Sequence, residues 1–194
     1  MLVLASTLVL ASRSPRRQQI LRDAGIPFVV RAADVPEERR DGESPIDYVR
    51  RLAEAKAFAS PIGPGEVVLG ADTTVAIDNH VLEKPRDTAD AMRMLALLSG
   101  REHRVITGIC MRNESRKIID TATTRVRFVQ LTQEEIATYA ALGEPMDKAG
   151  GYAIQGLASK FIDRIEGDYF NVVGLPVALV YHYWREISQQ TATC

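Results

Sequence analysis

The sequence has almost no net charge and very little cysteine. Its 24 Lys and Arg residues nearly balance 25 Asp and Glu residues, so the formal net charge is -1. This balance removes the main electrostatic argument for a nucleic-acid coat protein or a protein of anionic membrane surfaces, and we expect neither partner. The two cysteines, Cys110 and Cys194, cannot form a disulfide framework or a four-ligand zinc site. Their scarcity fits a reducing compartment, so we expect a cytoplasmic protein.

Long apolar runs and the common phosphate-loop motifs are also missing. No run approaches the ~20 apolar residues of a membrane-spanning helix, which excludes an integral membrane protein. The apolar start, residues 1–12, leads directly into three arginines. This order is the reverse of a secretory signal, and we interpret the start as a buried strand. The sequence also lacks the Gly-rich loop that ends in Lys and Ser or Thr, and the Gly-x-Gly-x-x-Gly motif, so P-loop and Rossmann chemistry have no sequence support.

Helix and strand signals alternate along the chain. Helices are predicted to begin at Ser14-Pro15, at Ser44-Pro45, at Asp87 or Thr88, at Thr132 and near Leu175-Pro176. Strands are predicted at 28–32, 67–77, 103–111 and 117–130, with a charged loop at 34–41. Because the last two strands flank a polar turn, we expect a mixed α/β sheet with helices, in one domain of residues 1–194, rather than a purely parallel sheet.

The first candidate site is the turn between the first strand and the first helix, from Ser12 to Arg17. A helix N-terminus offers free N–H groups and the positive end of the dipole, yet Arg16 and Arg17 stand where acidic residues are preferred. One alternative is that both arginines are solvated or pair with Glu37 and Glu38. The strand-turn-helix setting favours a phosphate group above the helix start.

Asp72 is the second candidate, because it interrupts an otherwise apolar strand together with its neighbours from Gly70 to Thr73. An unpaired buried carboxylate would cost several kcal/mol or lose its charge, so we expect Asp72 to meet a cation or a metal ion. The alternative is a turn-forming Asp at the end of a strand.

The third candidate is the glycine-rich segment 147–156. Its glycines permit close backbone approach, and Gln155 can present a donor and an acceptor to a flat polar ligand. The alternative is a buried Gln that serves only a turn. Lys56 and Lys84 are weak signals by themselves, since most lysines are solvated charges. The histidines are too dispersed for a metal motif or a triad and are expected to be surface or core residues: His80, His103 and His182.

Together these motifs resemble the Maf-like nucleoside triphosphate pyrophosphatases over nearly the whole chain. In order, they are Leu-Ala-Ser-Arg-Ser-Pro-Arg-Arg ending at Arg17, the acidic loop with Glu37, Leu-Ala-Glu-Ala-Lys-Ala around Lys56, Gly-Ala-Asp-Thr ending at Thr73, Lys84-Pro85, Leu-Ser-Gly100, Glu-Pro-Met-Asp-Lys-Ala-Gly150, Tyr-Ala-Ile-Gln-Gly156 and Val-Val-Gly-Leu-Pro176. The resemblance implies an elongated two-lobed domain with a central cleft. It also implies hydrolysis of a nucleoside triphosphate to the monophosphate and pyrophosphate, with a divalent metal ion. One departure is that Gly151 and Ala153 exchange the small residues usual at these places, a swap that would shift the base-side loop slightly.

The resemblance also implies roles for single residues. Asp72, Lys56 and Lys84 are expected to be catalytic, Ser12, Arg16, Arg17, Thr73 and Gln155 to bind substrate, and Glu37 and Asp72 to bind the metal. The pair Thr73 and Gln155 matches the branch that prefers dTTP and UTP, rather than the branch that acts on 7-methyl-GTP. The chemistry of these residues agrees with the roles that the resemblance implies. Basic groups and a helix N-terminus can neutralise a triphosphate, and carboxylates suit Mg²⁺ or Mn²⁺. Asp72 is the expected general base for the attacking water.

Two functional hypotheses follow from these residues. The first is a dTTP and UTP pyrophosphatase, with modified pyrimidine nucleotides as further substrates. The second is a nucleotide-sensing interaction protein, in which the same pocket binds the nucleotide without turnover and controls a partner in cell division. The intact set of acidic and basic residues favours the enzyme. A homodimer is expected from the resemblance alone.

Overall fold

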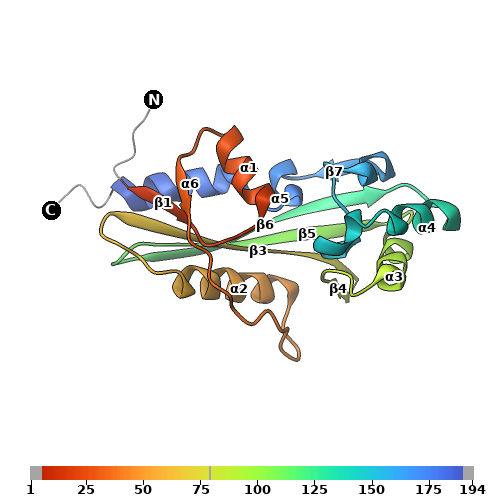
Figure 1. Ribbon diagram of the computed structural model, residues 1–194, viewed down its shortest axis with the longest axis horizontal. Helices are drawn as coiled ribbons and strands as arrows, with labels where there is room; N and C mark the ends of the chain where they lie inside the picture. Colours follow the sequence, from red (N-terminus) through yellow and green to blue (C-terminus); the bar gives the residue numbers. More distant parts are fainter. Residues whose placement is uncertain (1–5, 79, 190–194) are drawn as a thin grey trace. The chain divides into compact units, whose positions relative to one another are not determined.

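The computed structural model describes residues 6–78 and 80–189 and shows an α/β protein (Figure 1). The strands are β1 (Thr7–Leu10), β2 (Phe28–Val30), β3 (Glu66–Ile77), β4 (His80–Leu82), β5 (Glu102–Arg112), β6 (Lys117–Phe128) and β7 (Ile162–Glu166). The helices are α1 (Pro15–Asp23), α2 (Pro45–Ala59), α3 (Thr88–Leu98), α4 (Gln133–Ala141), α5 (Tyr169–Val173) and α6 (Val177–Gln189). Three short 3-10 helices, η1 (Glu144–Asp147), η2 (Ala149–Gly151) and η3 (Leu157–Phe161), follow α4.

The strands form one mixed sheet in the order β2-β1-β3-β5-β6-β7, and β4 pairs with β3 outside this path. Strand β1 runs parallel to both β2 and β3, whereas β4 is antiparallel to β3 and β7 is antiparallel to β6. This arrangement confirms the mixed α/β sheet flanked by helices that the sequence predicts. No helix among the described residues is long and apolar enough to cross a membrane.

The chain divides into two compact units, each assembled from separate segments. The first unit holds the described residues up to Asp72, the segment Thr107–Ala122 and the described residues from Gly174 onward. The second unit holds Thr73–Ile106 and Thr123–Val173. The expected single domain of residues 1–194 includes positions 1–5, 79 and 190–194, which lie outside the described residues, and it stays a prediction.

In the first unit, α2 covers one face of the strands while α1 and α6 cover the other (Figure 1). Alternate residues of β1 point to opposite faces, so Val9 and Ala11 pack against Ala53 and Ala57 of α2. The contact is close because Gly70 in β3 has no side chain. A Cβ atom there would lie 2.1 Å from the Ala53 carbonyl oxygen. The small residues therefore set the distance between α2 and the sheet.

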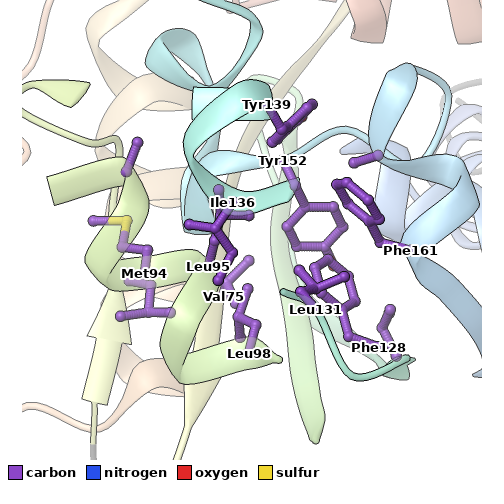
Figure 2. Packing of buried hydrophobic residues seen from close by; sticks show 14 of the residues in the cluster. Val75, Met94, Leu95, Leu98, Phe128, Leu131, Ile136, Tyr139, Tyr152 and Phe161 are labelled. Atoms are coloured by element: carbon purple, nitrogen blue, oxygen red, sulfur yellow. The ribbon is translucent and has the colours of Figure 1, made fainter. Parts of the chain in front are cut away.

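The second unit has its own core between α3, α4 and the strands that face them. Figure 2 shows Leu95 and Leu98 of α3 beside Ile136 of α4, with the rings of Phe128 and Tyr152 in the same cluster. The Phe128 and Tyr152 rings meet edge to face, with centroids 4.9 Å apart. This core fixes the starting point of the loop that follows Tyr152.

Most predicted boundaries agree with the structure because local capping sets them. The Ser14, Ser44 and Asp87 side chains cap α1, α2 and α3, and Thr132 forms the expected capping box with Glu135. The predicted strands 28–32 and 117–130 are each two residues too long, since β2 ends at Val30 and β6 ends at Phe128. Strand β3 continues without a break through Gly70 to Thr73. The backbone is therefore not interrupted there, and only the side chains change from apolar to polar. The short elements β4, β7 and α5 carry no pattern that the sequence reading detected.

Of the predicted buried strand over residues 1–12, the structure describes only the later part. Thr7–Leu10 form β1, in which Leu8, Val9 and Leu10 are fully buried. Residues 1–5 lie outside the described residues. The interpretation of this segment as a buried strand is confirmed for β1.

Candidate functional site

The centre of the candidate site in the first unit is the Lys56 side chain. Its ammonium nitrogen lies 2.6 Å from Asp72 Oδ1 and 2.5 Å from Glu37 Oε1. The Lys56 and Asp72 side chains are only 12% and 11% exposed, whereas the Glu37 side chain is 49% exposed. Asp72 thus meets the cation that its buried position requires, and its alternative interpretation as a turn residue at a strand end is wrong.

The packing of α2 explains why Lys56 reaches Asp72. Gly70 and Asp72 are two residues apart in β3, so they share one face of the strand. That face touches α2 at Gly70, where a Cβ would lie 2.6 Å from the Ala57 backbone nitrogen. Lys56, the residue before Ala57, is therefore carried to within hydrogen-bond distance of Asp72. In the sequence, Lys56 cannot be distinguished from a solvated lysine. Its contact with Asp72 in the folded chain makes that distinction.

Opposing effects act on the carboxyl group of Asp72. Burial raises the pKa of Asp72, while the charges of Lys56 and Arg17 and the hydrogen bond from Lys56 lower it. Burial dominates, so the carboxylate is a stronger base than an exposed aspartate. A buried carboxylate with a raised pKa and a hydrogen-bonded cation is suited to accept a proton from a water molecule.

Arg17 approaches β3 from α1, which covers the other face of the sheet. Its guanidinium donates to the carbonyl oxygens of Ala71 and Gly174 at 2.8 and 2.9 Å and to Ser12 Oγ at 3.1 Å. The residue is 8% exposed, and burial lowers the pKa of Arg17, with the Asp72 charge opposing that effect. The alternative interpretation of Arg17 as a solvated arginine is therefore wrong.

The turn from Ser12 to Arg16 combines a capped helix N-terminus with a basic side chain. Ser14 caps α1 by accepting from the Arg17 backbone nitrogen, and its own nitrogen donates to Ser12 Oγ. No acidic residue occurs in the first turn of α1, where the half-buried Arg16 follows Pro15. The positive end of the helix dipole therefore coincides with two arginines, and this combination favours a phosphate group.

Two residues that the sequence reading did not single out hold the acidic loop in place. The Tyr48 hydroxyl donates to the Glu37 carbonyl oxygen at 2.8 Å, and Arg51 donates to the Glu38 carbonyl oxygen at 3.0 Å. Arg51 also binds both carboxylate oxygens of Glu43, and this pairing lowers the pKa of Glu43 to about 2. Both residues lie on α2, so the helix that carries Lys56 also positions the loop that carries Glu37.

The side chains of this site can supply only some of the ligands that a divalent cation needs. Glu37 and Asp72 offer carboxylate oxygens, which Mg²⁺ and Mn²⁺ prefer. Among residues 6–78 and 80–189 there is no group of three or more His, Cys, Asp or Glu side chains that could hold a metal ion. Because Mg²⁺ commonly keeps several waters and binds through one or two carboxylates plus substrate phosphates, two carboxylates fit a cation that arrives with a triphosphate.

The other three expected site residues, Thr73, Lys84 and Gln155, belong to the second unit. Lys84 is exposed in the loop after β4. This loop is tied to the glycine-rich segment, because the Gly150 nitrogen donates to the Glu83 carbonyl oxygen at 3.1 Å. A Cβ on Gly151 would lie 3.3 Å from Pro85. The second unit thus brings the Lys84 loop and the glycine-rich segment together, a contact that sequence spacing alone did not reveal.

Gln155 lies in a turn of the same segment. The Gly156 nitrogen donates to the Ala153 carbonyl oxygen at 3.0 Å, which closes a turn around Ile154 and Gln155. Gln155 is exposed, so its alternative interpretation as a buried residue that serves a turn is wrong. Thr73 is half-buried in β3, directly after Asp72.

The histidines lie where the sequence reading expected them, in the core or on the surface. His80 and His182 are exposed. His103 is buried, and its Nε2 lies 2.7 Å from the Tyr152 hydroxyl oxygen. Burial lowers the pKa of His103 to about 3, so this imidazole is neutral at physiological pH.

Comparison with known proteins agrees with this geometry. The family described as Maf-like protein matches residues 7–187 of the chain. A dTTP/UTP pyrophosphatase of Koribacter versatilis is 53% identical over 92% of this chain and 93% of its own length. Proteins with the same name from Symbiobacterium thermophilum and Citrifermentans bemidjiense are 51% and 49% identical. They cover 88% and 94% of this chain, and 88% and 96% of their own lengths.

Among solved structures, a HAM1 protein from Coxiella burnetii matches with a TM-score of 0.43 and 18% identity. The match covers 65% of this chain and 74% of that protein. The family assignment rests on the family match and the curated relatives, not on this likeness.

Proposed function

The chain belongs to the Maf-like protein family, and from this membership we propose that it is a nucleoside triphosphate hydrolase that converts dTTP and UTP to their monophosphates and pyrophosphate. The observation that carries the proposal is the buried Lys56–Asp72 ion pair, next to which Arg17 donates to the carbonyl oxygen of Ala71. Hydrolysis of a polyanionic phosphoanhydride requires a base for the attacking water and cationic groups for the phosphate charge, and this arrangement can supply both.

Asp72 holds the attacking water and takes its proton as the oxygen approaches the α-phosphorus. Its carboxylate is kept ionised by Lys56, while burial raises its pKa and so increases its basicity. Cleavage of the α–β bond then releases pyrophosphate. The proton that Asp72 accepts comes from the water, whose oxygen becomes part of the nucleoside monophosphate.

Cationic groups stabilise the charge that builds up on the leaving pyrophosphate. The N-terminus of α1 and Arg16 supply N–H donors and positive charge in the first unit. Lys84 contributes a further charge from its exposed position after β4. Arg17 acts from within the protein, because its bonds to Ser12 and Ala71 fix the turn and the strand on which the phosphate-binding groups stand.

Glu37 and Asp72 are the residues that would hold a divalent cation, together with oxygens of the triphosphate. Bound there, Mg²⁺ or Mn²⁺ would supply neutralisation of phosphate charge. The half-exposed Glu37 side chain can leave Lys56 more readily than the buried Asp72 can, since water can solvate the Glu37 carboxylate.

Gln155 and Thr73 are proposed to select the base. The pairing edge of uracil or thymine presents acceptor, donor and acceptor in sequence, and a side-chain amide can match two of them at once. Gln155 is exposed in its turn and so is accessible to a nucleotide base. Modified pyrimidine nucleotides that keep this edge are included in the proposal. The cytoplasmic location and the homodimer stay predictions.

The rival hypothesis, a nucleotide sensor without turnover, is not favoured. A sensor needs cations to bind the triphosphate, but it does not need a buried carboxylate base beside them. Placing Asp72 at 8% exposure carries a desolvation cost that a binding protein has no reason to bear.

A product assay separates these possibilities. Release of phosphate is measured with malachite green across UTP, dTTP, CTP and GTP, with and without added inorganic pyrophosphatase. The proposal expects phosphate from UTP and dTTP only when pyrophosphatase is present, and UMP from UTP by chromatography. Hydrolysis of UTP in ¹⁸O-water should put the label in UMP. UDP with free phosphate, or label in pyrophosphate, would contradict the proposal.

A further inference from the structure

Glu144 is the first residue of η1, shortly before the glycine-rich segment 147–156, and the proposed reaction does not use it. Its side chain accepts a hydrogen bond from the Tyr139 hydroxyl at 2.8 Å. It also accepts from the Leu157 backbone nitrogen, at 3.1 Å on one carboxylate oxygen and 3.2 Å on the other. The carboxylate of Glu144 therefore joins α4 to the start of η3, directly after the turn that carries Gln155.

Gly156 allows this contact. A Cβ atom on Gly156 would lie 2.3 Å from Glu144 Oε1 and 2.8 Å from Oε2. Any larger residue would therefore displace the carboxylate. Since the Gly156 nitrogen also closes the turn on Ala153, the carboxylate packs against the residue that ends the turn.

Glu144 is itself held firmly by its surroundings. The Lys148 ammonium donates to the Glu144 carbonyl oxygen at 2.7 Å, which fixes the backbone of η1. Burial and the bond to Glu144 raise the pKa of Tyr139, so its phenol remains a donor to the carboxylate. Tyr139 packs edge to face on Phe161 at 5.6 Å within the second-unit core.

The other end of the turn is anchored as well. Tyr152 is 5% exposed, its hydroxyl oxygen lies 2.7 Å from His103 Nε2, and its ring packs on Phe128. Between these two anchors, the short stretch from Ala153 to Gly156 has little freedom. An exposed glutamine amide can discriminate between bases only if its backbone is held, because a mobile amide adapts to any hydrogen-bonding edge.

From these contacts we propose that Glu144 is a positioning residue for base selection, which holds the turn of Gln155 through Gly156 and the Leu157 N–H group. The inference rests on the proposed function, because it gives the fixed turn the task of recognising a pyrimidine edge. Glu144 does not touch the nucleotide. Its loss would lower selectivity for UTP and dTTP and leave the hydrolytic groups of the first unit in place.

The test compares two variants that break the same contact from opposite sides. Glu144→Ala removes the acceptor, and Leu157→Pro removes the donor at the first position of η3, where proline is tolerated. Leu157 is exposed, so loss of its side chain costs little packing. In Glu144→Gln, one carbonyl oxygen can still accept from both Tyr139 and Leu157, so this variant should retain most of the selectivity.

Each variant is assayed for pyrophosphate release from UTP and GTP, with thermal unfolding to verify that it is folded. Glu134→Gln on the exposed face of α4 is the matched control. We expect Glu144→Ala and Leu157→Pro to lower the ratio of kcat/KM for UTP over GTP by about tenfold, the effect of one charge-assisted hydrogen bond. Glu144→Gln and the control should stay within about threefold of the parent.

The outcomes separate the inference from the proposed function. If the parent releases pyrophosphate from UTP and both disruptive variants fold with an unchanged UTP-to-GTP ratio, the positioning role is overturned and the proposed function stands. An equal loss of activity on UTP and GTP also overturns it, because this would be a structural effect without selectivity. If the parent releases no pyrophosphate from any nucleotide, the proposed function fails and the inference fails with it.

Discussion

The Lys56 ammonium lies between two carboxylates, 2.6 Å from Asp72 Oδ1 and 2.5 Å from Glu37 Oε1. The two contacts differ in kind, because the Asp72 side chain is buried and the Glu37 side chain is half exposed. Breaking the buried contact would leave an uncompensated charge in the protein, whereas water can replace the exposed one. Glu37 is therefore the carboxylate that can exchange partners when a substrate binds.

Because α2 must touch β3 for Lys56 to reach Asp72, we predict that Gly70→Ala damages both stability and activity. The new Cβ would lie 2.1 Å from the Ala53 carbonyl oxygen, and backbone cannot yield as a side-chain end can. The expected cost is about 1–3 kcal/mol of unfolding free energy, measured in urea, with a fall in kcat for UTP. Gly63→Ala, whose Cβ would lie 3.3 Å from the Glu66 carboxylate and not against backbone, is the control. Equal stability of the two variants would contradict the close packing of α2.

The substitution Asp72→Asn should abolish hydrolysis while nucleotide binding stays within about tenfold of the parent. The change removes the base but keeps the shape of the side chain and a hydrogen-bond acceptor for Lys56. Steady-state kinetics with UTP and calorimetry of nucleotide binding test the two parts separately. Asp41→Asn, in the exposed loop before α2, is the control and should leave both unchanged. General-base losses are about 100-fold or more, so turnover above a few per cent of the parent rejects Asp72 as the base.

Removal of divalent metal should also stop the reaction. We expect EDTA to abolish UTP hydrolysis and Mg²⁺ or Mn²⁺ to restore it. Glu37→Gln should raise the metal concentration for half-maximal activity by about tenfold or more, since loss of one carboxylate weakens a site with few protein ligands. Glu38→Gln is the matched control, because Glu38 is bound by Arg51 through its backbone carbonyl oxygen. Full activity in EDTA would exclude a metal requirement.

The elements of the fold could largely be predicted because their ends are set by neighbouring residues. Ser14 and Thr132 cap their helices through contacts three residues away, and such contacts are visible in a sequence. The short strand β4 was missed because it is defined by pairing with β3 rather than by an apolar pattern of its own.

The candidate site was harder to predict because its contacts join distant parts of the chain. Lys56 is one lysine among many until α2 packs at Gly70. Glu144 belongs to the motif that ends at Gly150, but the motif does not reveal its role, since its partner is the backbone nitrogen of Leu157, thirteen positions later. Because every residue except proline has a backbone N–H group, the residue type does not show which of these groups will act as a donor. Gly156 was the available signal, because a close approach by another group is one reason for a glycine in a turn.

The buried imidazole of His103 predicts a pH dependence of stability. The folded-state pKa of His103 is lowered from 6.5 to about 3 because burial disfavours the charged form. Between these values the unfolded chain binds more protons than the folded one, so stability is lost as pH falls below 6.5. The slope from this group approaches about 1.4 kcal/mol per pH unit.

Urea unfolding from pH 7 to pH 5 tests this dependence in the parent and in His103→Gln. The variant should be less stable at pH 7, because it disturbs the contact with Tyr152, but its stability should fall less steeply with acid. Exposed His182, replaced by Gln, is the control and should keep the slope of the parent. Parallel curves for the parent and His103→Gln would show that His103 is not the titrating group.

The last prediction concerns the choice of base by Gln155. An amide supplies a donor and an acceptor together, whereas an ionised carboxylate supplies acceptors only. Gln155→Glu should therefore leave the uracil acceptor that faced the amide donor without a partner and place it against a negative charge. We expect kcat/KM for UTP and dTTP to fall by at least about tenfold, with a smaller fall for GTP. UTP and dTTP should be affected alike, because the thymine methyl group lies off the pairing edge. Gln133→Glu, at an exposed position of α4, adds the same charge to the second unit and should leave kcat/KM for UTP, dTTP and GTP unchanged. If Gln155→Glu left the preference for UTP over GTP unchanged, this turn would not read the base, even with the hydrolytic assignment of Asp72 intact.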